Sequence, residues 1–315
     1  MSKDLLIAIG GGMLSAFASL AFMSGMPGAL LAVYLAPLPL LLVGLDHGTK
    51  AASLAGLSGI ILTGLVGGAM SGLLFAVIHA LPAWIIVRQG LQKRPGADGK
   101  VEEWYPVGFI LCILTVFCTG LYTVATVWSL GEDGGLHAIV QSYLSQVFAF
   151  MMPAMDEAAR GDLVQAISPL FPGYMGISWV MMAAVNASIA MAILTRAKRL
   201  ARPKTKLADL TLPDWMSWFL IAAAAVALLG QGELEFFGRN LALILAVPFF
   251  FLGLAVVHKV AAQVQFPGTL LAAFYLVLLL SGWIAMVVIG AGLLEQWIGL
   301  RRRFIITGSG RNDDD

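Results

Sequence analysis

The stretch PVGFILCILTVFCTGLYTVATVWSL, residues 106–130, decides the fold class. It contains no Asp, Glu, Lys or Arg, and about 20 apolar residues in a helix are enough to cross the hydrocarbon core of a bilayer. Similar runs lie on both sides of it. Across the chain 59% of the residues are hydrophobic and 12% are charged, which is about half the charged fraction of a soluble domain. The sequence therefore predicts an all-α, polytopic helical membrane protein.

Nine apolar runs predict membrane spans. The first four are joined by very short turns, so we expect them to form tight antiparallel hairpins. The seventh run is short for a bilayer, and the ninth is long, so we expect the ninth to tilt or protrude. The expected spans are 5–25, 28–45, 49–67, 69–88, 106–130, 171–195, 215–230, 239–259 and 269–297.

The distribution of charge predicts the orientation of these spans. Lys and Arg are concentrated in the loops 89–105 and 196–212. In the segment 131–170, by contrast, most of the charged residues are Asp or Glu. By the positive-inside bias, the two loops and the amino terminus are expected in the cytoplasm of a bacterial inner membrane, with 131–170 outside. Nine spans would place Arg301–Arg303 outside, against the same bias, so eight spans remain the alternative.

The chain is expected to have four parts. An amphipathic pattern in the second part, over 136–152, predicts a helix at the outer interface, and Glu157–Ile167 predicts a second short helix. This segment would either cover the bundle or act as a lid over a ligand. The four parts are an amino-terminal transmembrane hairpin series (1–130), an external amphipathic segment (131–170), carboxy-terminal transmembrane helices (171–303) and a disordered tail (304–315).

A few polar side chains lie inside the apolar runs, where they are costly and are therefore candidates for ligand contact. The fifth run carries Thr119, Tyr122 and Thr126 on one helix face, the sixth carries Asn186, and the fourth carries His79. We expect them to line an outward-facing pocket for an unknown small molecule, between the fifth and sixth spans. The alternatives are threonines bonded to their own helix, an asparagine that joins two helices, and a histidine that satisfies a carbonyl freed by a nearby proline.

Small residues recur every four positions on the first predicted helix and across the junction between the third and fourth. Such stripes let helix backbones approach closely, which promotes association inside a bilayer. Each stripe is expected to be either an internal packing face or a subunit interface, and the first could dock another membrane subunit. The stripes are Ala8, Gly12 and Ala16, and Gly64, Gly68 and Gly72.

Motifs that would indicate an enzyme are nearly absent from the sequence. There is no zinc-protease helix motif, no phosphate loop and no pair of intramembrane aspartates. Residues 56–59 spell the G-x-S-G of rhomboid proteases, but the rest of that active site is not visible. We expect no catalytic residue, metal or cofactor, and a net charge of +1 provides no reason to expect nucleic acid as a partner.

Two segments of the chain resemble the YybS-like family of uncharacterised polytopic membrane proteins. The first is APLPLLLVGLDHGTKAASLAGLSGIILTGLVGGAMSGLLFAVIHALPAWII (Ala36–Ile86). The second runs from Arg239 through Phe249–His258 to LLEQWIGLRRR (Leu293–Arg303). The resemblance covers most of the chain and is a pattern of helices rather than a catalytic signature.

That family is similar, in its first six spans, to the substrate-binding S components of energy-coupling-factor transporters. The resemblance implies small-molecule binding or transport, with the stripe of Ala8, Gly12 and Ala16 in the place where S components dock a membrane coupling subunit. The alternative function is a non-transporting membrane scaffold or partner-recruiting protein. The expected partners are the lipid bilayer and either a membrane coupling subunit or further copies of the same chain. The chain has no nucleotide-binding motif, so transport driven by ATP would need a separate subunit.

Overall fold

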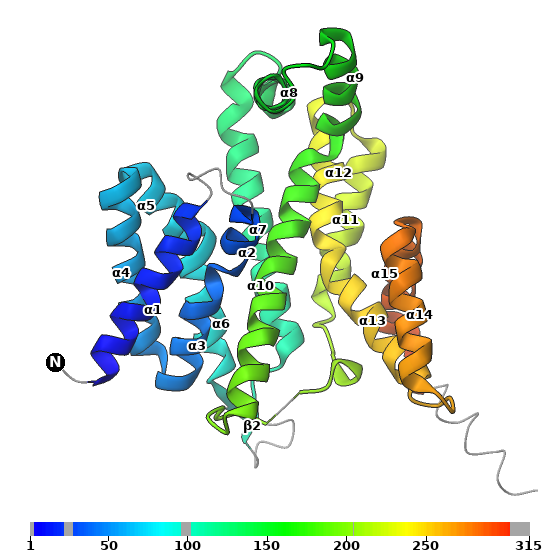
Figure 1. Cartoon of the computed structure of the whole chain (residues 1–315). Coiled ribbons are helices and arrows are strands. Elements are labelled where there is room, and N and C mark those ends of the chain that lie inside the picture. The colour runs from blue at the N-terminus through cyan, green and yellow to red at the C-terminus, as the bar shows by residue number, and fades with distance from the viewer. Residues whose placement is uncertain (1–2, 22–27, 96–101, 204, 303–315) are drawn as a thin grey trace, which may run out of the picture. The chain divides into compact units, whose positions relative to one another are not determined.

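The computed structural model describes residues 3–21, 28–95, 102–203 and 205–302, and it is almost entirely helical (Figure 1). The predicted short turn between the first and second spans and the predicted tail 304–315 lie outside the described residues. The chain divides into two compact units. One comprises Met1–Leu114 and Met181–Thr205, and the other comprises Thr115–Val180 and Lys206–Asp315. These will be called unit 1 and unit 2.

Two long helices contribute to both units, namely α7 (Val107–Trp128) and α10 (Phe171–Arg196). Unit 1 also contains a two-stranded antiparallel ribbon between its hairpin series and α7. The remaining elements of unit 1 are α1 (Lys3–Leu20), α2 (Ala29–Leu35), α3 (Pro37–His47), α4 (Thr49–Gly67), α5 (Ala69–Phe75), the π-helical turn η2 (Ala76–Ala80), α6 (Leu81–Gly90), β1 (Lys93–Pro95) and β2 (Glu102–Trp104).

Single glycines connect α3 to α4 and α4 to α5. Gly48 has φ 92° and Gly68 has φ 85°, a left-handed region that side chains with a Cβ rarely adopt. Each glycine ends one helix and begins the next, so the chain reverses within one residue. The very short turns predicted between the second and third spans and between the third and fourth spans are confirmed.

Unit 2 holds the remaining helices. Its largest helix contacts are between α11 and α12 and between α13 and α15. Its elements, besides its parts of α7 and α10, are η3 (Ser129–Gly131), α8 (Gly135–Met151), α9 (Glu157–Ile167), η4 (Ser168–Leu170), η5 (Leu207–Asp209), α11 (Trp215–Leu229), α12 (Glu233–Leu245), α13 (Val247–Ala261), α14 (Pro267–Leu280) and α15 (Trp283–Ile298).

The segment predicted to be an amphipathic helical pair forms α8 and α9. Val140 and Leu144 of α8 are buried together with Val164 of α9, and Phe171 packs against this small core. Asp156 begins α9 because its carboxylate accepts hydrogen bonds from the first backbone N–H groups of the helix. The pair therefore buries its apolar stripe against its own unit.

Seven helical runs are long and apolar enough to cross a membrane, among the residues that the structure describes. They correspond to the predicted spans one to six and eight. The predicted seventh span is the shorter apolar helix α11. The chain is thus an all-α, multi-pass membrane protein. The seven runs are Lys3–Leu20, Ala29–His47, Thr49–Gly67, Ala69–Gly90, Val107–Gly131, Glu157–Arg196 and Glu233–Ala261.

The prediction of one long ninth span over 269–297 is wrong. The run is broken at Ser281 and Gly282 into α14 and α15. The backbone of Ser281 is extended, with φ −137° and ψ 90°, so the helix ends there. At 1.5 Å per residue, the two helices are about 21 Å and 24 Å long, short of the roughly 30 Å hydrocarbon core. In Figure 1 α14 and α15 form a hairpin next to the end of α13.

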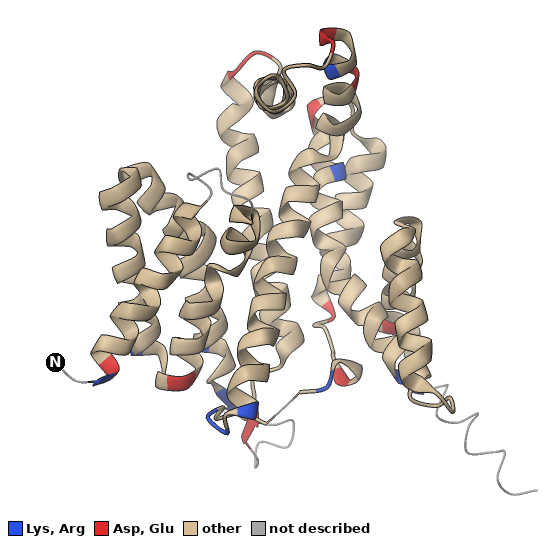
Figure 2. Ribbon diagram, in the orientation of Figure 1, with Lys and Arg blue, Asp and Glu red and all other residues tan. Residues whose placement is uncertain are grey.

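Charged residues cluster at helix ends and in the connecting segments, as Figure 2 shows. Few of them lie in the middle of a helix; an example is Arg239 in α12. This is the pattern expected where the middle of each helix faces lipid or other apolar helices.

Candidate functional site

The threonines of the predicted polar stripe bond to their own helix. The Thr119 hydroxyl donates to the carbonyl of Val116 at 2.9 Å, and the Thr126 hydroxyl donates to the carbonyl of Tyr122 at 3.0 Å. Tyr122 is buried in unit 2, where its hydroxyl lies 3.5 Å from the carbonyl oxygen of Phe236 and its ring stacks on Phe237. Each of these hydroxyls thus has a protein acceptor.

Asn186 lies near the middle of α10 and is almost fully buried, with 1% of its surface exposed. Its Nδ2 donates to the carbonyl of Tyr34 at 2.7 Å and to that of Met182 at 2.8 Å. Only the amide nitrogen can donate to two carbonyls, so the orientation of the amide is fixed. Its Oδ1 has no hydrogen-bond partner among the described residues.

His79 lies in the π-helical turn η2, three residues before Pro82. The ring is 3% exposed and packs against Phe75, with 5.5 Å between the ring centroids. Within the described part of the chain, its Nδ1 has no hydrogen-bond partner. A π turn inserts one extra residue into a helix and is frequent at functional sites.

These five predicted residues fall into two groups. Asn186 and His79 belong to unit 1, and Thr119, Tyr122 and Thr126 belong to unit 2. Only the pair in unit 1 keeps buried polar atoms without partners among the described residues. A pocket shared by all five remains a prediction.

The predicted stripe of small residues on α1 lies against α4. Ala8 and Ala16 are fully buried, and a Cβ on Gly12 would overlap with the carbonyl of Ala55 and the hydroxyl of Ser58. This contact corresponds to internal packing, one of the two alternatives expected for the stripe. The face of α1 that carries the stripe is therefore covered within unit 1.

The second stripe joins α4 to α5. A Cβ added to Gly72 would lie 3.2 Å from the Cα of Gly64, which is tighter than ordinary van der Waals contact. Gly68 forms the turn between these two helices. The three glycines therefore let the arms of this hairpin approach backbone to backbone.

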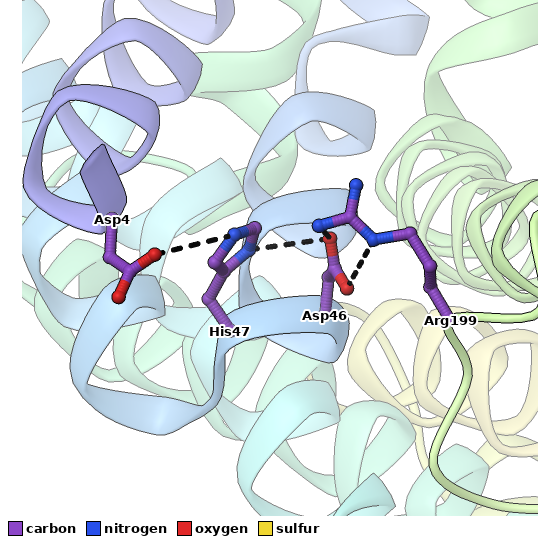
Figure 3. Close-up of polar contacts among 4 residues, drawn as sticks. All are labelled: Asp4, Asp46, His47 and Arg199. Atoms are coloured by element: carbon purple, nitrogen blue, oxygen red, sulfur yellow. Dashed lines mark hydrogen bonds and ion pairs between the residues drawn. The ribbon is translucent and has the colours of Figure 1, made fainter.

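A cluster of charged groups at one end of unit 1 was not predicted as a site (Figure 3). Arg199 donates from Nε to the Asp46 carboxylate at 2.9 Å and pairs with it a second time through Nη2. His47 lies between two carboxylates, 3.4 Å from Asp46 and 3.9 Å from Asp4. The cluster ties the segment after α10 to the α3–α4 turn.

Arg202 lies near that cluster in sequence and is 5% exposed. Its guanidinium donates to the carbonyl of Gly90 at 3.4 Å and to that of Tyr105 at 3.3 Å. Burial lowers the pKa of this side chain from its ordinary value. Because it bonds the last carbonyl of α6, Arg202 neutralises the negative end of that helix dipole.

Unit 2 contains a cavity of about 830 Å³ at the end of α13 and α15. Glu295 and Arg301 form a largely buried ion pair in its wall, with 2.8 Å between Nε and Oε1. Charges of both signs and apolar side chains line the cavity, so it can accommodate a molecule with a polar and an apolar part. The charged lining residues are Asp209, Asp214, Lys259, Glu295, Arg301 and Arg302.

Comparison with known proteins identifies the family. A family model described as "Predicted membrane protein (DUF2232)" matches residues 13–294. The chain belongs to this family. None of the curated proteins and none of the solved structures compared with the chain matches it. The DUF2232 match includes His79 and Asn186 and ends just before Glu295.

The charged cluster of unit 1 and the cavity of unit 2 were not predicted, because the sequence of this DUF2232 protein marks their residues only weakly. Asp46 and His47 look like an ordinary turn, and Arg199 and Arg202 look like part of a basic loop. Glu295 and the arginines after it resemble an interfacial anchor, and the cavity beside them depends on the break at Ser281 and Gly282. Among the described residues no group of three or more His, Cys, Asp or Glu side chains could hold a metal ion.

Proposed function

We propose that this DUF2232 protein is a multi-pass protein of the bacterial inner membrane that binds a small molecule at membrane depth, like an S component. The amino terminus would lie in the cytoplasm, and the segment 131–170 outside. Any transport would need a separate energy-coupling subunit, because the chain has no nucleotide-binding motif.

The observation that carries this proposal is the Oδ1 of Asn186, which has no partner among the described residues. A buried polar atom without a partner costs about 1–3 kcal/mol, and the interior of a bilayer supplies no water to replace the partner. Asn240 in unit 2 provides a comparison. It is equally buried and also bonds the carbonyl four residues before it, but its Oδ1 accepts a hydrogen bond from Gly173.

The chemistry of the ligand follows from these atoms. Oδ1 of Asn186 is an acceptor, so the ligand carries an N–H or O–H donor. Nδ1 of His79 adds a second polar atom without a partner in the described part of the same unit. Near these residues the helices of unit 1 carry mostly apolar side chains, so a mostly apolar molecule with few hydrogen-bonding groups fits best.

Native mass spectrometry of the detergent-purified protein tests the proposal. We expect the wild-type protein to retain a small molecule, and Asn186→Ala to lose it. Ser188→Ala is the matched control, because this hydroxyl lies on the same helix and bonds the carbonyl of Ala184. His79→Phe keeps a ring of similar size against Phe75 and should also lower retention. Equal retention in all four proteins, or none in the wild type, would contradict the proposal.

The alternative function, a non-transporting scaffold, would use the small-residue helices or the basic loops to bind a partner. The stripe on α1 is covered by α4, and Arg199 and Arg202 are engaged within unit 1. Both observations reduce the surface available to a partner. They also mean that a coupling subunit would have to dock on another face of the protein.

A further inference from the structure

The cavity of unit 2 lies where three segments of the chain meet. Residues 208–214 form one wall, Leu252 and Lys259 of α13 form another, and residues 295–302 at the end of α15 form the third. Lys259 is near the end of α13 and Arg301 follows the end of α15, so both helices end at the same side of the unit. The cavity therefore lies at the base of the α14–α15 hairpin.

The position of the cavity relative to the membrane follows from the short hairpin. α14 and α15 form a hairpin that reverses at Ser281 and Gly282, so the chain enters and leaves it on one face of the membrane. Arg301 donates to the carbonyl of Ala208 at 2.6 Å, two residues after the basic Lys206. The positive-inside bias assigns that basic segment to the cytoplasm, so the cavity lies at the headgroup level of the cytoplasmic leaflet.

One of the three cations at the cavity is already paired within the protein. Arg301 binds Glu295 through both Nε and its backbone N–H, each at 2.8 Å. Lys259 is half-buried and Arg302 is exposed, and neither forms an ion pair with any residue that the structure describes. These two side chains are available to an anionic group.

The remaining lining residues define the rest of the ligand. Asp209 and Asp214 also lie at the cavity, so a multiply charged anion would be repelled, whereas a group that joins a phosphate to an amine matches both signs. Leu252 and Trp297 supply apolar and indole surface, as is typical of the membrane interface. The lining thus combines charges of both signs with contact area for acyl chains.

We propose that this cavity binds the headgroup of a zwitterionic phospholipid, with the phosphate at Lys259 and Arg302 and the amine at Asp209 and Asp214. The proposal uses unit 2 alone and does not depend on the small-molecule function proposed for unit 1. The contact between Lys259 and the phosphate would be a partly exposed ion pair, and we expect its loss to weaken lipid binding by up to about fivefold.

Native mass spectrometry of the full-length protein in detergent, with phosphatidylethanolamine added, tests the site. We expect one lipid to remain bound to the wild type and Lys259→Ala to bind it less tightly, by up to about fivefold. Lys206→Ala removes an exposed lysine from the same unit that does not line the cavity, so it should bind like the wild type. If both variants lost the same amount of affinity for the lipid, or if neither lost any, the proposal would be overturned.

A second measurement does not require a variant to fold. In the wild-type protein, an amine-reactive reagent should label Lys259 more slowly when phosphatidylethanolamine is present. The ratio to Lys206 corrects for reagent that the lipid amine consumes. Phosphatidylglycerol should protect Lys259 less, and inorganic phosphate or diacylglycerol should not protect it. Equal protection by inorganic phosphate would show that the site takes free phosphate, and equal protection by phosphatidylglycerol would exclude a role for the amine; either result contradicts the proposal.

Discussion

The side chain of Asn240 caps the first turn of α10: its Oδ1 accepts a hydrogen bond of 2.7 Å from the backbone N–H of Gly173. Its Nδ2 donates to the carbonyls of Pro169 and Phe236 at 2.9 Å and 2.8 Å. The first N–H groups of a helix have no partner within it, and here a neighbouring helix supplies one. Asn240 therefore fixes α12 to the beginning of α10.

Replacing Asn240 with leucine should destabilise the protein by about 3 kcal/mol, because the buried N–H of Gly173 and the carbonyl of Pro169 would lose their partner. Thermal unfolding in detergent measures the effect. The control is Thr126→Val, whose hydroxyl bonds its own helix and whose replacement should change the stability by no more than about 0.5 kcal/mol. Similar midpoints of thermal unfolding for the two variants would show that the hydrogen bonds of Asn240 do not stabilise the protein.

Gly12→Leu should lower the stability by about 3 kcal/mol, because a larger side chain forces α1 away from Ala55 of α4. Gly10→Leu is a closely matched control. Gly10 lies on the same helix, and a Cβ added there would have no neighbour within 4 Å among the described residues, so this variant should unfold like the wild type. A destabilised Gly10→Leu together with a stable Gly12→Leu would place the contact face of α1 on its other side.

Asp46→Asn should destabilise the protein by about 1 kcal/mol, since it breaks the two-point pair with Arg199. The Asp46 side chain is 12% exposed and Arg199 is 54% exposed, so solvent screens part of the interaction. The pair between Glu235 and Arg239 on α12 is the comparison. Glu235→Gln should cost about 0.5 kcal/mol or less in the same chemical-denaturation series, and a larger loss there than at Asp46 would contradict the expectation.

The α14–α15 hairpin predicts the side on which the chain leaves the membrane. Single cysteines at positions 206 and 302 should resist a membrane-impermeant maleimide applied to the outside of intact spheroplasts, and a cysteine at position 157 should react. The native Cys112 and Cys118 are buried and should not interfere. If position 302 reacted together with position 157, the hairpin would have to cross the membrane as a single span.

The parts of the fold that depend on local pattern could be predicted from the sequence. Runs such as 106–130 contain no charged residue, and Gly48 and Gly68 mark reversals that few other residues allow. The amphipathic pattern of α8 predicts that Val140 and Leu144 share one face, and both are buried. Such features depend on neighbours in the chain, so a single sequence is enough to predict them.

The features that depend on partners distant in sequence could not be predicted. Asn240 stands among charged residues, and its partner Gly173 is far away in the chain. The same holds for Arg301, whose acceptor is the carbonyl of Ala208. The break at Ser281 and Gly282 escapes prediction for another reason: one serine and one glycine hardly change the hydropathy of a long apolar run, although they end the helix.

We expect the one-residue turns at Gly48 and Gly68 to affect how the protein enters the membrane during synthesis. A helix that enters lipid alone needs a flexible linker on each side, so that it can rotate and move along the membrane normal. The linkers of α4 are single glycines, Gly48 and Gly68. With connections this short, α4 would have to move into lipid together with α3 and α5. We therefore expect these three helices to partition into lipid together, and a longer linker at Gly68 to let α4 be inserted before α5.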